Sequence, residues 1–156
     1  NGILINNPLG WLVNNIQSNF ALFKDNGIKY FSKIILAIRP DSKDFEDLIK
    51  ASYNISRFYN AELTLLHIFS EEQSTKQKEN MTLKSNQDLY SKINTIRIEI
   101  ADNPIQCISN ITAEYDLLIL GTPKKDTWKK MLFGTGKDPL ATQSNCSVLR
   151  LTIKDV

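Results

Sequence analysis

Five short apolar segments, separated by segments with a helical pattern, run from residue 33 to residue 153. The segments 33–38 and 116–120 are apolar without alternation, which is typical of parallel strands buried on both faces. A third apolar segment covers 62–69. The segments 95–100 and 148–153 alternate apolar and polar residues, which indicates half-exposed strands near the edges of a sheet.

Four helices are expected between these strands. Residues 44–59 place apolar side chains along one side at helical spacing, and Asp41 or Ser42 is positioned to cap this helix. Further helices are expected within 81–92, from Asn103-Pro104 onward, and between 134 and 143. Strands that alternate with helices through right-handed crossovers predict an α/β fold with a doubly wound, five-stranded parallel sheet of the Rossmann-like type.

The N-terminal 29 residues follow a different pattern. Apolar residues recur there at helical spacing: Leu12, Ile16, Phe20 and Phe23. They predict an extra N-terminal amphipathic helix that ends near Gly27. This helix either packs on the domain or a partner subunit, or connects the domain to an upstream protein. We therefore divide the chain into a connector, 1–29, and an α/β domain, 30–156.

Composition narrows the function classes. The chain has 156 residues, 42% of them hydrophobic and 23% charged, which fits one globular domain. A net charge of +2 is too small to indicate a nucleic-acid partner. Two cysteines and one histidine, without metal-type spacing, predict neither a disulfide framework nor a metal site. No apolar run approaches a membrane span, and the first residue, Asn1, suggests a piece of a longer protein.

The segment 116–140 carries the candidate chemistry. Its strand stops at Gly121, and five lysines then fall between residues 124 and 137, alongside a single acid. Backbone N–H groups at a glycine-rich turn or a helix start bind anions, and ligands in α/β folds lie beyond the carboxyl ends of the strands. The lysines form either an anion-binding patch or a solvated helix face. The sequence Gly-Thr-Gly-Lys at 134–137 is no phosphate-binding P-loop, because Met131 replaces the first glycine and Asp138 follows the lysine.

These motifs resemble the universal stress protein family over residues 30–154. The signature of that family is a glycine after the fourth strand, two residues, a second glycine, nine residues, and then Gly-Ser/Thr. Gly121, Lys124 in place of the second glycine, and Gly134-Thr135 keep this spacing. Three more segments fit the family: 65–68 in the second strand, 101–104 at a helix entry, and 145–149 at the chain's close.

The resemblance implies a site for ATP or another adenine nucleotide, with no other cofactor. The residues that it assigns to the site are Ile38, Arg39, Gly121, Thr122, Lys124, Gly134, Thr135 and Gly136. Arg39 stands where the family has an aspartate that meets the ribose, and a guanidinium only donates hydrogen bonds. Lys124 stands where a glycine approaches phosphate, and its ammonium is itself a phosphate partner. A nucleotide site, a site for another anion and an empty site all remain open.

The expected function is a non-catalytic regulatory domain, because no nucleophile–base pair or acidic pair has catalytic spacing. Residues 21–38 resemble the connector that follows the membrane part of some transporters, so we expect a cytoplasmic domain of a larger, transporter-type protein. Family members commonly dimerise through the last strand, which predicts a homodimer through Val148 to Ile153. The alternatives are a ligand-free interaction module, a free-standing ATP-binding stress protein and, least favoured, a nucleotide hydrolase.

Overall fold

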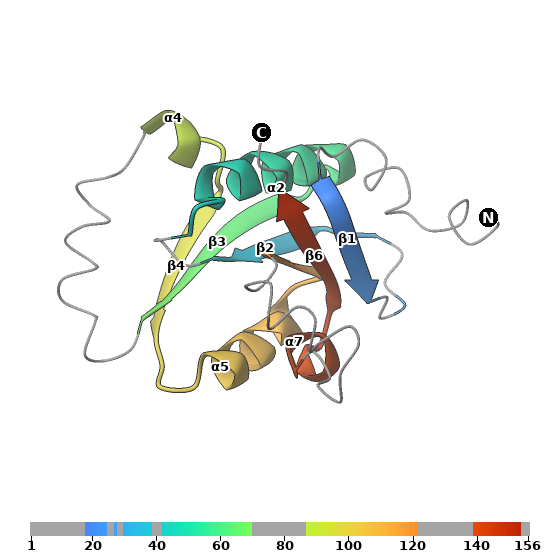
Figure 1. Ribbon diagram of the computed structural model, residues 1–156, viewed down its shortest axis with the longest axis vertical. Coiled ribbons are helices and arrows are strands. Elements are labelled where there is room, and N and C mark those ends of the chain that lie inside the picture. The colour runs from blue at the N-terminus through green and yellow to red at the C-terminus, as the bar shows by residue number, and fades with distance from the viewer. Residues whose placement is uncertain are drawn as a thin grey trace.

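The computed structural model describes residues 18–24, 27, 30–38, 42–69, 87–121 and 139–153. Strands in this part of the chain form one six-stranded sheet in the order β1-β6-β5-β2-β3-β4 (Figure 1). Their bounds are Ser18–Lys24 (β1), Lys33–Ala37 (β2), Glu62–Phe69 (β3), Thr95–Ile100 (β4), Leu117–Gly121 (β5) and Ser147–Ile153 (β6). Strands β2 to β6 are parallel to one another, and β1 runs antiparallel to β6. The predicted five-stranded parallel sheet is confirmed, with each strand boundary correct to within one residue.

Helices cover both faces of the sheet (Figure 1). Their bounds are Phe45–Tyr59 (α2), Gln87–Tyr90 (α4), Pro104–Ile111 (α5) and Pro139–Gln143 (α7), and a 3₁₀ turn, η2, covers Thr112–Glu114. Along β2, buried residues alternate between the two faces. Leu36 packs with Leu48 and Ile49 of α2, whereas Ile35 packs with Ile108 of α5. These two apolar clusters are the core, and the sheet separates them.

The starts of α5 and α2 test the capping residues that were predicted from the sequence. The Asn103 side chain caps α5 by accepting a hydrogen bond from the Gln106 N–H (3.1 Å), and a proline occupies the first turn, as predicted. The capping prediction for α2 is wrong for Ser42, which contributes only its backbone carbonyl to the Phe45 N–H (3.3 Å). The N-cap residue of α2 is Asp44, whose side chain makes no capping hydrogen bond. Asp41 lies outside the described residues.

Residues 18–24 form a strand where the sequence predicts a helix. In β1, Leu22 pairs with Arg150 and Phe23 with Leu149 of β6. Apolar residues three or four apart fit a helix, but aromatic residues also favour strands. Here the pairing with β6 stabilises the strand conformation. Without β1, the outer backbone groups of β6 would have no strand to pair with. Residues 1–17, where the rest of the predicted helix falls, lie outside the described residues.

The last strand is not an edge of the sheet, contrary to the prediction. Strand β6 lies between β5 and β1, so its hydrogen-bonding edges face strands on both sides. The open edge that supported a homodimer through Val148 to Ile153 is therefore occupied by the chain's own residues 18–24. The edge position predicted for residues 95–100 is confirmed, because β4 ends the sheet on the other side.

Candidate functional site

The chain order of the parallel strands reverses between β2 and β5. From β2 the chain adds β3 and β4 on one side of the sheet, and then β5 and β6 on the other side. Ala37 lies opposite Leu120 in the register of β2 and β5, so Ile38 and Gly121 come next to each other at the carboxyl edge. Ligands in open α/β sheets bind at this switch point. The structure thus brings together two residues that the family resemblance assigned to the site.

A buried histidine holds the end of β2. His67 of β3 is 0% exposed, and its Nδ1 lies 2.9 Å from the Ile38 carbonyl oxygen. Because a carbonyl only accepts, Nδ1 carries the proton and donates to Ile38. The ring stacks on Phe45 of α2 with centroids 5.8 Å apart, and Nε2 is buried with no hydrogen-bond partner in the described part of the chain. The imidazole is therefore neutral, and it fixes the carbonyl of a candidate site residue.

Burial lowers the pKa of His67 below its ordinary value of 6.5, and the hydrogen bond to Ile38 offsets this only in part. The unfolded chain consequently binds a proton before the folded chain does as pH falls. Stability from this group is fully present above the ordinary histidine range and declines as pH falls through 6.5 toward the lower folded pKa. Protonation would also give Nε2 a buried N–H with no acceptor.

We expect the free energy of unfolding to fall between pH 7.5 and pH 5.5 by up to about 1.4 kcal/mol per pH unit. The measurement is urea denaturation across this range for the wild type and the His67→Asn variant. Asparagine keeps an amide donor near the position of Nδ1 but does not titrate, so its profile should be flatter. Equal slopes in the two proteins would show that another group controls stability in this range.

The end of β5 is held by contacts on both faces. The Gly121 carbonyl accepts a hydrogen bond from Nη1 of Arg150 at 2.9 Å, and Arg150 is only 7% exposed. On the other face, a Cβ on Gly121 would lie 3.0 Å from Cδ1 of Leu48, which is tighter than an ordinary van der Waals contact. Glycine at this position therefore has a packing reason as well as the predicted ligand reason.

Sequence reasoning missed two residues of this region, His67 and Arg150, as partners of the strand ends. Both are basic side chains that stand between apolar neighbours within a strand, at Leu66-His67-Ile68 and Leu149-Arg150-Leu151, which is the signal that was available. The other assigned residues lie outside the described part of the chain: Arg39, Thr122, Lys124, Gly134, Thr135 and Gly136. The described residues contain no group of three or more metal-ligating side chains. Within the same residues, no helix is long and apolar enough to cross a membrane.

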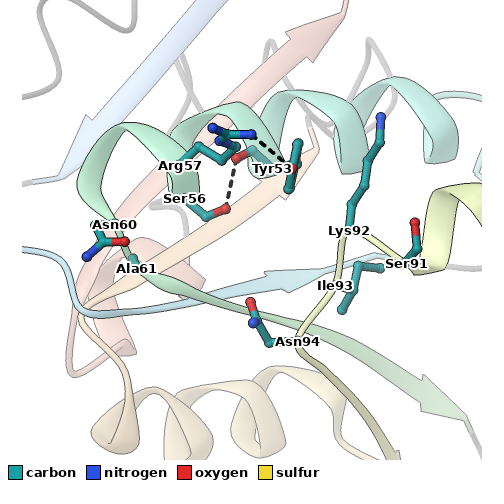
Figure 2. A pocket seen from close by; sticks show the side chains of 9 residues that line it. All are labelled: Tyr53, Ser56, Arg57, Asn60, Ala61, Ser91, Lys92, Ile93 and Asn94. Carbon is teal, nitrogen blue, oxygen red and sulfur yellow. Dashed lines mark hydrogen bonds between the residues drawn. The ribbon is translucent and has the colours of Figure 1, made fainter.

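A polar hollow of about 390 Å³ lies where α2 ends and β4 begins (Figure 2). Of its described lining residues, Arg57 and Lys92 are the charged ones, and they lie 5.9 Å and 5.4 Å from the centroid of the Tyr53 ring. Asn60 and Asn94 flank it, at the amino end of β3 and β4. Parallel strands place this end opposite the carboxyl edge that carries Ile38 and Gly121. The hollow is therefore separate from the candidate site.

No protein-family model matches the sequence, and no curated protein matches it. Solved structures do share its fold. One is a universal stress protein in complex with cAMP, 16% identical, with a TM-score of 0.59, matching 80% of this chain and 98% of that one. Another is universal stress protein UspA from Lactobacillus plantarum, 14% identical, with a TM-score of 0.58 and coverages of 80% and 99%. A third, from Archaeoglobus fulgidus in complex with dAMP, is 11% identical, with a TM-score of 0.56 and coverages of 78% and 98%.

Proposed function

We propose that this domain, which has the fold of the universal stress proteins, binds an adenine nucleotide at the carboxyl edge of β2 and β5. The observation that carries the proposal is the placement of Ile38 beside Gly121 at the switch point of the sheet. Two solved proteins of the same fold hold cAMP and dAMP. The base and ribose would lie against the ends of these strands, and the phosphates against the segment that begins at Gly121.

Fixed backbone groups support this assignment. His67 fixes the Ile38 carbonyl and Arg150 fixes the Gly121 carbonyl, so both strand ends are held in place before a ligand arrives. A site that is already ordered loses less entropy on binding. The lysines after Gly121, with Arg39 after β2, would supply positive charge to phosphate oxygens. We assign Lys124 as a phosphate partner that replaces the backbone contact of a glycine.

The test is isothermal titration of the domain with ATP and with AMP. We expect the wild type to bind ATP with a dissociation constant of about 1–100 µM. Lys124→Ala should weaken ATP binding about tenfold, because a charge-assisted hydrogen bond is lost. The matched control is Lys50→Ala, since Lys50 is an exposed lysine of α2 paired with Glu46 at 3.1 Å, and it should bind ATP as the wild type does.

Two results would contradict parts of this proposal. If neither the wild type nor any Lys124 variant binds a nucleotide, the site does not exist. If only Lys124→Gly binds, the side chain closes an intact site and its ammonium is no phosphate partner.

The role that we propose is regulatory rather than catalytic, in a cytoplasmic domain of a larger transporter-type protein. The imidazole beside Ile38, that of His67, is buried and already bonded to a backbone carbonyl, so it is poorly placed to act as a general base. The full-length coding sequence tests the tethering. An upstream membrane-spanning region would support it, and a reading frame that starts near Tyr30 would exclude it.

A ligand-free interaction module is the second candidate function. Gly121 favours it, because the close contact with Leu48 explains a glycine without any ligand. The titration above separates the two candidates, since this one requires that no nucleotide binds.

A further inference from the structure

Among the described residues, no strand pairs with the outer edge of β4. Strand β4 ends the sheet, and the Ala101 N–H that follows it donates to the Phe69 carbonyl of β3 at 2.9 Å. Because backbone direction repeats every two residues along a strand, the odd-numbered residues of β4 face β3. The N–H and C=O groups that face away from the sheet belong to three isoleucines: Ile96, Ile98 and Ile100.

The side chains of β4 reverse the usual burial pattern. Its three isoleucines are 41–45% exposed, although they are the apolar residues of the strand. On the opposite face, Arg97 and Glu99 are partly buried and form an ion pair at 2.7 Å, and Arg97 also contacts Glu114 at 3.2 Å. An exposed row of isoleucines beside an open backbone edge indicates an interaction surface.

We propose that β4 is a homodimer interface at which a second copy of this chain adds its own β4 antiparallel, about a two-fold axis at Ile98. The sequence of the strand is complementary to itself in this register. Ile98 meets Ile98 of the second copy, and Ile96 meets its Ile100. Arg97 lies opposite Glu99 of the second copy, and the symmetry repeats this pair. The two sheets then form one continuous sheet.

Backbone, packing and charge all favour this register. The outward N–H and C=O groups of the isoleucines pair with those of the second copy, which is the way an isologous strand contact forms. The isoleucine rows join on one face, and opposite charges lie across from each other on the other face. Strand β4 also lacks the lysine and proline residues that commonly protect exposed edges. This interface is independent of nucleotide binding.

Charge reversal tests the register directly. Arg97→Glu places glutamate opposite glutamate twice, and Glu99→Arg places arginine opposite arginine twice. Each single variant should weaken the dimer by at least about tenfold in sedimentation equilibrium. An equimolar mixture of the two variants should recover a dimer, because every facing pair is again of opposite charge. The double variant R97E/E99R should recover one for the same reason.

Two further variants separate the interface from the fold. Ile98→Lys should give a monomer, because two ammonium groups would meet at the axis. Ile105→Lys is the control: Ile105 is 37% exposed but lies on α5, outside the strand. It should dimerise as the wild type does. Thermal denaturation must show that each variant is folded. A monomeric wild type, or charge variants that dimerise as the wild type does, would overturn the proposal.

Discussion

Leu48→Ala is expected to lower the free energy of unfolding by about 2–5 kcal/mol. Leu48 is 1% exposed and belongs to the apolar cluster between α2 and the sheet. Truncation removes buried methyl groups and leaves a cavity that the sheet on one side and the helix on the other cannot fully close. Urea denaturation of the domain, followed by circular dichroism, measures the loss.

A second substitution should couple to this one. Gly121→Ala alone is expected to cost about 1–3 kcal/mol, because its Cβ would crowd Cδ1 of Leu48 at 3.0 Å. In the Leu48→Ala background the same Cβ enters the cavity. The double variant should therefore be more stable than the sum of the single effects predicts, by about 0.5–3 kcal/mol.

Ile55→Ala is the matched control for this cycle. Ile55 is 0% exposed and lies on α2, as Leu48 does, but seven residues further along the helix. That separation is about 10 Å, so Ile55→Ala and Gly121→Ala should be additive. Additivity in the Leu48 cycle as well would show that Gly121 is not held by this contact. The ligand explanation of the glycine would then gain weight.

Asp116→Ala is expected to cost about 2–4 kcal/mol. One carboxylate oxygen, Oδ2, accepts hydrogen bonds from the backbone N–H groups of Ser32 (2.8 Å) and Lys33 (2.9 Å). The Asp116 N–H donates to the Lys33 carbonyl at 2.8 Å. These contacts join the starts of β2 and β5 and so contribute to the register that places Ile38 beside Gly121.

Asp116→Asn is the control, because it keeps one acceptor oxygen without the charge. We expect it to lose about half as much stability as Asp116→Ala. If nucleotide binding at the opposite edge is confirmed, Asp116→Ala should also weaken it. A stability within error of the wild type would show that water replaces the carboxylate at these exposed N–H groups.

The sequence predicted the parallel sheet well because each central strand is marked by its own residues. Leu117, Leu118 and Ile119, for example, are all 0% exposed, as an unbroken apolar segment indicates. Residues 18–24 were mispredicted because their conformation depends on β6, which lies some 130 residues later in the chain. Periodicity in one segment carries no information about such a distant partner.

The candidate site was predictable only in part. Gly121 was found because a glycine that ends an apolar strand is a local signal. Ile38 was assigned through the family resemblance. The contacts of His67 and Arg150 join residues 29 positions apart, and that of Asp116 joins residues 84 apart. No local pattern states which carbonyl or N–H such a side chain will meet. The sequence showed a basic residue between apolar neighbours, but it did not show which backbone group that residue would bond.

The pairing of β1 with β6 also determines where the chain enters the sheet. Ser18, the first residue of β1, pairs with Ile153, and Leu151 of β6 lies opposite Gly121. The entry point is therefore at the carboxyl edge, one strand beyond β6 and at the same edge of the sheet as the candidate site. A segment that pulls on Ser18 would exert force on β1, the strand next to β6. Arg150 of β6 donates the hydrogen bond that holds the Gly121 carbonyl. A force applied upstream of Ser18 and a ligand bound at the candidate site would therefore both act on Arg150 and Gly121.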